Sequence, residues 1–119
     1  MNIEDRVKKI EQKYVSLIED VLILKLTDET LKIILKMRGG ATLRISERWK
    51  ENKLFRYSYY WLDSENNLKI GWDNAPHHKN LETFPHHKHL GEKLNIVDSH
   101  EKCLEDVMDI LKTQLTSSK

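Results

Sequence analysis

The stretch that decides the fold runs from Leu31 to Ile45 and reads LKIILKMRGGATLRI. Apolar and charged side chains alternate on both sides of its double glycine, which is typical of two half-buried strands joined by a hairpin. A three-residue loop over 38–40 places Leu35 opposite Leu43, whereas a two-residue loop would place Leu35 opposite Arg44. Because a slip of one residue moves every side chain to the other face, we predict the first register.

The same alternation extends the hairpin in both directions. An apolar run at 21–26 predicts a strand before it, and the stretches 54–62 and 68–72 predict two strands after it. We therefore predict a five-stranded antiparallel meander over 21–73 with one strongly aromatic face. The predicted opposite pairs are Trp49 with Phe55, Ile45 with Tyr59, Leu43 with Trp61, Leu68 with Trp61, Ile70 with Tyr59, and Trp72 with Tyr57.

Helices are expected at both ends of the sheet, over 1–20 and 98–116. Asp98 followed by Glu101 reads as a capping box that opens the second helix. The apolar spacing of the first helix predicts a face toward the core, although it would also suit the seam of a homodimer. Its stripe is Ile3, Val7, Ile10, Tyr14 and Leu17, and that of the second helix is Leu104, Val107, Met108, Leu111 and Leu115. The sequence thus predicts one α+β domain, 1–119.

Composition limits the classes of function. The chain has 119 residues, of which 33% are charged, with a net charge of +1. Such a balance excludes a global field that holds nucleic acid, so a nucleic-acid site requires local clustering of charge. Cys103 is the only cysteine, which excludes an internal disulfide. The charged stretch 2–13 is unlike a signal peptide, and no apolar run approaches the roughly 18 residues of a membrane span, so we expect a cytoplasmic protein without a membrane partner.

Basic side chains gather on the predicted face away from the aromatic residues. Seen alone, such a face is typical of solvated surface. Its position beside a histidine-rich loop favours a role in binding nucleic acid. The predicted nucleic-acid-binding residues are Arg44, Arg48, Arg56, Tyr60, Lys69 and Lys88.

A long loop is expected over 74–97, and it contains the tetrapeptide Pro-His-His-Lys twice, at 76–79 and 85–88. Imidazole titrates near neutrality, which suits proton transfer or metal ligation. Three interpretations follow: acid–base cleavage of a phosphodiester, a metal site, or an ordered structural loop. The spacing matches no standard zinc motif, so we expect no metal and no cofactor. The candidate catalytic residues are His77, His78, His86, His87, His89, Asp73 and Glu47.

Two carboxylates have open alternatives. Glu47 lies on the aromatic face opposite Tyr57, where it pairs with a tyrosine hydroxyl, orients an imidazole, or sits at the sheet edge in water. Asp73 falls opposite Arg56 in the predicted register. It therefore either pairs with that arginine or fixes the tautomer of a histidine.

Three motifs carry a family resemblance: YSYYWxD at 57–63, WDNAPHH at 72–78 and TFPHHKH at 83–89. With them the chain, from about Arg44 to Leu115, resembles the TumE-like toxins of prokaryotic toxin–antitoxin modules. The resemblance implies a small cytoplasmic toxin with a cognate antitoxin, often a DNA-binding regulator. Many small toxins of this type attack RNA, so the resemblance favours a nuclease. Our leading hypothesis is a metal-independent ribonuclease. A non-catalytic nucleic-acid-binding protein and a metal-dependent nuclease are the alternatives.

Overall fold

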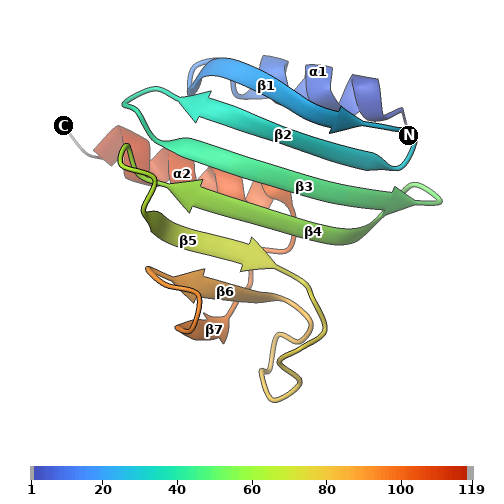
Figure 1. Cartoon of the computed structure of the whole chain (residues 1–119), viewed down its shortest axis with the longest axis vertical. Coiled ribbons are helices and arrows are strands. Elements are labelled where there is room, and N and C mark those ends of the chain that lie inside the picture. The colour runs from blue at the N-terminus through green and yellow to red at the C-terminus, as the bar shows by residue number, and fades with distance from the viewer. Residues whose placement is uncertain (1, 118–119) are drawn as a thin grey trace.

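The structure, a computed structural model, describes residues 2–117 and shows one antiparallel sheet with two helices (Figure 1). The sheet has seven strands in the order β1 to β7, so it is an open meander. The predicted α+β class is confirmed, but the prediction of five strands is wrong. The elements are α1 (Ile3–Lys13), β1 (Ile18–Leu26), β2 (Thr30–Met37), β3 (Thr42–Lys50), β4 (Lys53–Leu62), β5 (Leu68–Asp73), β6 (His87–Leu90), β7 (Ile96–Asp98) and α2 (Leu104–Ser117).

The central hairpin has the predicted register. Leu35 pairs with Leu43 and Ile33 pairs with Ile45, so the loop is 38–40. Gly39 and Gly40 adopt φ values of 93° and 94°, a region that glycine enters at little cost. The alternation of apolar and charged side chains therefore sets both the faces and the register of β2 and β3.

The next two hairpins keep most of the predicted faces but not all of the predicted pairs. Between β3 and β4 the pairs Ile45–Tyr59 and Leu43–Trp61 are confirmed, whereas Trp49 pairs with Leu54 and not with Phe55. The cause is an irregularity after Arg48, which feeds a two-residue turn at 51–52 with positive φ values. A one-residue shift at this point moves Phe55 out to solvent.

Between β4 and β5 the predicted register is wrong by two residues. Ile70 pairs with Trp61, Trp72 pairs with Tyr59, and Leu68 pairs with Leu62. The turn is longer than expected, because the N–H of Asp63 donates to the carbonyl of Asn67. The register also shifts by one residue between Trp61 and Leu62 of β4. A shift of two residues leaves every side chain on its predicted face. It also moves Asp73 from Arg56 to a position opposite Ser58.

The predicted loop over 74–97 contains two further strands. β6 pairs with β5 and β7 pairs with β6, so the sheet extends past its expected edge. His87 lies opposite Asp73, and His89 lies opposite Gly71. The second half of the histidine segment is therefore part of the sheet.

The predicted helix bounds are also corrected. α1 ends at Lys13, not near 20, because the N–H groups of Leu17 and Ile18 both donate to the carbonyl of Tyr14 and the chain turns into β1. Asp98 does not cap a helix. It belongs to β7, and α2 begins only at Leu104, so pairing with β6 overrides the local capping pattern.

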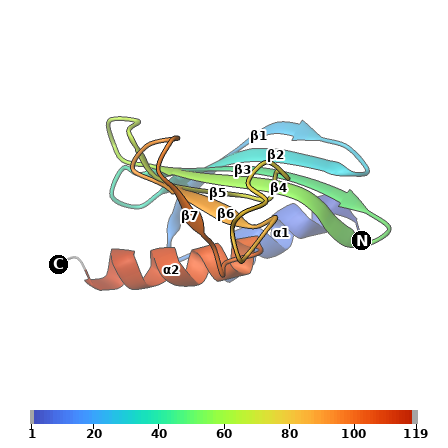
Figure 2. The same ribbon diagram turned by 90° about the horizontal axis from the view of Figure 1, so that it is seen from below.

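Both helices lie on one face of the sheet, the aromatic one (Figure 2). The whole predicted stripe of α1 is buried against it, so a homodimer would have to use another surface. Leu115, expected on the apolar face of α2, lies outside the described side chains. The core includes Ile3, Val7, Ile10, Leu35, Ile45, Tyr59, Trp72, Leu104, Met108 and Leu111. No helix covers the opposite face within residues 2–117, and we call it the open face.

Candidate active site

The open face carries three arginines, Arg44, Arg48 and Arg56, which we call the arginine patch. Arg48 pairs with Arg56 across β3 and β4, and Arg44 pairs with Tyr60, so all of these side chains share one face. Within residues 2–117 none of the three guanidinium groups has an ion-pair partner. The patch therefore presents positive charge that no described carboxylate neutralises.

The other predicted nucleic-acid-binding residues lie differently. Tyr60 is half-buried on the open face over Gly71, where an added Cβ would come within 3.2 Å of the tyrosine ring. The ammonium of Lys69 lies 4.4 Å from the centroid of the Trp61 ring. Lys88 is on the helix-covered face, opposite Trp72, and forms a 3.0 Å ion pair with Glu101. The structure therefore places Lys88 away from the arginine patch.

Next to the patch, Asp73, His87 and His89 form a buried group that we call the Asp73 cluster. His87 Nε2 lies 2.9 Å from Asp73 Oδ1, and His89 Nε2 lies 3.1 Å from Asp73 Oδ2. The N–H of Ala75 also donates to Oδ1. The second alternative for Asp73 is thus the one the geometry supports, because its carboxylate holds two imidazoles and not Arg56.

The remaining ring nitrogens of the cluster contact backbone carbonyls. His87 Nδ1 lies 3.1 Å from the carbonyl oxygen of Pro85, and His89 Nδ1 lies 2.6 Å from that of Lys93. A carbonyl oxygen only accepts hydrogen bonds, so both Nδ1 atoms carry a proton. Both rings therefore direct Nε2 at the same carboxylate.

His78, of the first Pro-His-His-Lys copy, contacts His87 of the second. Its ring lies edge-on to His87, with 4.7 Å between the centroids. The ring of His78 is half-buried, and its nitrogens have no hydrogen-bond partner among the described residues, so they are available to a substrate. His77 is exposed and makes no side-chain contact of this kind in the part of the chain that the structure describes.

His86 faces away from the Asp73 cluster. Its Nδ1 lies 2.8 Å from the hydroxyl of Tyr57, on the side of the sheet that the helices cover. Burial, followed by the charges of Lys102 and His87, lowers the pKa of His86. Burial also raises the pKa of the Tyr57 hydroxyl. Neighbouring histidines of the second copy therefore lie in different environments.

Glu47 has tyrosine, tryptophan and arginine partners and no histidine. Its carboxylate accepts hydrogen bonds from Arg6 at 2.9 and 3.1 Å, from the hydroxyl of Tyr59 at 2.6 Å and from Trp49 Nε1 at 3.1 Å. Arg6 also pairs with Glu105 of α2. Burial alone would lower the pKa of Arg6, but hydrogen bonds with the two glutamates raise it above its usual value. Arg6 thus links Glu47 of the sheet to Glu105 of α2, so this network joins both helices to the sheet.

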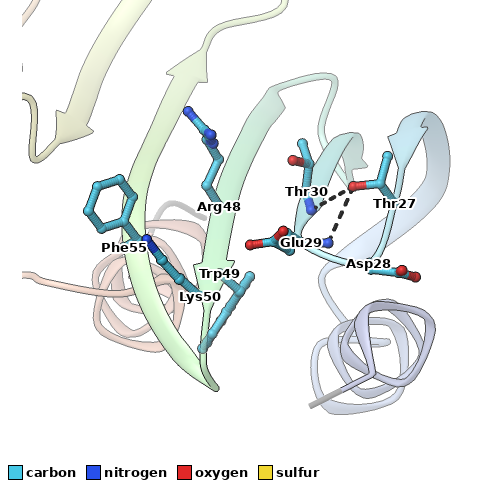
Figure 3. A pocket seen from close by; sticks show the side chains of 8 residues that line it. All are labelled: Thr27, Asp28, Glu29, Thr30, Arg48, Trp49, Lys50 and Phe55. Carbon is cyan, nitrogen blue, oxygen red and sulfur yellow. Dashed lines mark hydrogen bonds between the residues drawn. The ribbon is translucent and has the colours of Figure 1, made fainter.

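Arg48 of the arginine patch lines two hollows. A shallow one of about 250 Å³ joins the patch to the Asp73 cluster and is lined by Ser46, Arg48, Arg56, Tyr57, Ser58, Asp73 and Ala75. A larger one of about 540 Å³ lies at the far end of β3, as Figure 3 shows. There the Thr27 hydroxyl accepts hydrogen bonds from the N–H groups of Glu29 and Thr30. Arg48 lines both hollows, but only the smaller one reaches a predicted catalytic residue, so we place the candidate site there.

Comparison with known proteins identifies the family. The family model of toxin TumE matches residues 4–115, nearly the whole chain. The chain belongs to the TumE toxin family. Membership makes it the toxin component of a toxin–antitoxin module, which implies a cognate antitoxin. Neither the curated proteins nor the solved structures contain a significant match.

Two contacts of this TumE toxin were not expected from its sequence. Arg6 is a buried ion-pair partner of Glu47, although arginine is seldom buried. Glu101 accepts hydrogen bonds from Trp72 Nε1 and from Lys88, each at 3.0 Å. Burial would raise the pKa of Glu101, but these hydrogen bonds lower it. An aromatic face that carries one carboxylate was the only signal for such a network.

The described part of this TumE toxin contains no helix that is long and apolar enough to cross a membrane.

Proposed function

We propose that this TumE toxin is a metal-independent ribonuclease that cleaves RNA by general acid–base catalysis. The observation that carries the proposal is the contact between His78 and His87, one from each Pro-His-His-Lys copy, beside the arginine patch. Paired imidazoles at a basic surface supply both proton transfers that phosphodiester cleavage needs. The non-catalytic alternative would use the arginine patch alone.

In the proposed reaction His78 takes the proton from the ribose 2′-hydroxyl. The 2′-oxygen then attacks phosphorus, and the bond from phosphorus to the 5′-oxygen breaks. His87 gives its Nε2 proton to that leaving oxygen, and in doing so exchanges Asp73 for the substrate as its hydrogen-bond partner. Asp73 retains His89 and is a positioning residue. The products are a 2′,3′-cyclic phosphate and a 5′-hydroxyl end.

The arginine patch is proposed to bind the RNA backbone. Arg48 and Arg56 border the same hollow as Asp73, so a strand that crosses the patch reaches the carboxylate that contacts His87. Positive guanidinium groups also stabilise the negative charge that develops on phosphorus. Tyr60, half-buried on the same face, is proposed to contact a base.

The ends of the cleaved RNA test the reaction. Purified toxin in excess EDTA is expected to cut single-stranded RNA and to leave 5′-hydroxyl and 2′,3′-cyclic phosphate ends. The ends are mapped by ligation that requires a defined 5′ group, in vitro and after induction in cells. RNA that carries a 2′-O-methyl group at the cleaved position is the control and should stay intact. New 5′-phosphate ends, or cutting that stops in EDTA, would contradict the metal-independent mechanism.

Removing the arginine patch should weaken RNA binding and reduce its dependence on salt. Each phosphate neutralised on a single strand contributes about 0.7 to the slope of log affinity against log salt concentration, so the triple change Arg44→Ala, Arg48→Ala and Arg56→Ala should lower the slope by about 2. Fluorescence anisotropy across a salt series measures this slope. The matched control removes three lysines of α1, Lys8, Lys9 and Lys13, which lie across the sheet from the open face. Equal slopes in wild type and the patch variant would place the RNA elsewhere.

A further inference from the structure

The Asp73 cluster has the chemistry of a metal site. Two imidazole nitrogens and one carboxylate form the set that binds divalent first-row transition metals, with open positions left for water or another ligand. In this cluster the ligand atoms of Asp73, His87 and His89 lie within 4.8 Å of one another. Sequence spacing gave no reason to expect this set, because Asp73 reaches the two histidines through the pairing of β5 with β6.

The distances within the cluster suit a shared ion. The two contacts between Nε2 and the carboxylate measure 2.9 and 3.1 Å. Neighbouring ligand atoms of a tetrahedral Zn²⁺ site lie roughly 3.3 Å apart when the bonds to the metal are 2.0–2.1 Å. Small movements of three side chains would therefore place a cation between them.

The surroundings of the cluster orient all three ligands. Both imidazoles donate Nδ1–H to a backbone carbonyl, of Pro85 and of Lys93, which leaves Nε2 as the ligand atom. Ligating histidines in known metal sites are usually held in this way. The carboxylate of Asp73 is held in turn by the N–H of Ala75. Both histidine side chains are also buried, so their positions are fixed by packing.

Both Nε2 atoms point at the carboxylate of Asp73, and both Nδ1 atoms already contact backbone carbonyls. A divalent cation placed between the three side chains would bind both Nε2 lone pairs and a carboxylate oxygen. From this geometry we propose that Asp73, His87 and His89 bind one exchangeable divalent transition-metal ion of the Zn²⁺ class.

Zinc titration of the full chain tests the site without RNA. After EDTA treatment and dialysis, isothermal titration is expected to show one Zn²⁺ per chain at the tightest site, and Mg²⁺ in its place should give no such binding, because Mg²⁺ prefers oxygen ligands. His89→Ala and Asp73→Asn should weaken this site by about tenfold or more. The matched controls are His86→Ala and a change at His100, an exposed histidine outside the two Pro-His-His-Lys copies. His86→Ala and His100→Ala should bind Zn²⁺ as wild type does. Equal affinity in His89→Ala and His86→Ala would overturn the proposal.

A measurement on the wild-type chain covers the case in which the cluster variants fail to fold. Two-bond ¹H–¹⁵N spectra report each ring nitrogen, and Zn²⁺ should move the Nε2 signals of His87 and His89 while those of His77, His86 and His100 stay in place. Signals that move only at the other histidines would assign the metal to another site and overturn the proposal.

The metal site goes beyond the proposed reaction, and the two fail separately. Zinc and the transferred proton compete for Nε2 of His87, so Zn²⁺ is expected to slow RNA cleavage in wild type. Cleavage that requires Zn²⁺ would support the metal site while it contradicts the acid–base role of His87. Cleavage in EDTA together with no zinc binding would support the proposed reaction and overturn the site.

Discussion

Replacing His78 with alanine is expected to lower the rate of RNA cleavage by about 10²–10⁴-fold, the usual contribution of a group that transfers a proton in the transition state. His78 has ring nitrogens without a hydrogen-bond partner among residues 2–117, and its ring touches His87. Its loss should change the free energy of unfolding by roughly 1 kcal/mol or less, because the side chain is half-buried at the surface of the sheet. Single-turnover cleavage and a thermal melt measure the two quantities.

The neighbouring histidine supplies the control. His77→Ala removes an exposed imidazole from the same Pro-His-His-Lys copy, and its variant should cleave RNA nearly as fast as wild type. His87→Ala should lose activity as His78→Ala does, but it should also lower the melting temperature, since His87 is buried and bonded to Asp73. Equal activity in wild type, His78→Ala and His87→Ala would make the histidine segment structural. Growth arrest without RNA cleavage would favour the alternative of a toxin that acts by binding.

Sequence periodicity predicted the faces of the sheet better than the pairing of its strands. Alternation has a period of two residues, so the two-residue error between β4 and β5 left Trp72 and Asp73 on the correct faces. The length of a turn and the position of a bulge decide the register, and the pattern of apolar residues does not contain them. Only the central hairpin, where a one-residue slip would expose Leu35, was determined fully.

The strand β6 was not predicted because of its amino-acid composition. His-Lys-His-Leu has the alternation of a strand, yet the number of histidines and the two prolines favoured a loop. The same stretch shows why the site could only be predicted in part. Candidate residues were recognised by type, but their partners depend on tertiary pairing. Once β6 joins β5, Asp73 lies opposite His87 and the expected pair with Arg56 is not formed.

The contact between His78 and His87 could not be predicted from the local sequence either. The two residues are nine positions apart, at equivalent places in the two copies of one tetrapeptide. A doubled motif favours the use of one histidine from each copy, but it does not indicate which one. The choice follows from the alternation in β6, which directs His87 to the open face while His86, just before the strand, turns to Tyr57.

Replacing Glu47 with alanine is expected to destabilise the fold by about 3–5 kcal/mol, because removal of one partner leaves a buried charge without compensation. Glu47 is fully buried, and its loss leaves Arg6 with Glu105 alone and frees the Tyr59 hydroxyl and Trp49 Nε1. Such a change is a large part of the 5–15 kcal/mol that typically holds a domain together. Chemical denaturation, read as the midpoint at constant slope, measures it.

Two further variants test whether the loss of stability comes from the unpaired buried charge of Arg6. Glu105→Ala removes the other partner of Arg6, but the Glu105 side chain is 37% exposed, so the cost should be only about 1 kcal/mol or less. The double change Arg6→Met and Glu47→Leu removes both buried charges together and should restore much of the stability that Glu47→Ala loses, since an apolar pair needs no ionic partner.

The role of Glu47 in catalysis is tested by Glu47→Gln. This variant, measured where it is folded, should cleave RNA at the wild-type rate, because Glu47 touches no histidine. If Glu47→Gln is folded but no longer cuts RNA, Glu47 is a catalytic residue after all. If the denaturation midpoint of Glu47→Ala equals that of wild type, the buried ion pair contributes little to the stability of the fold.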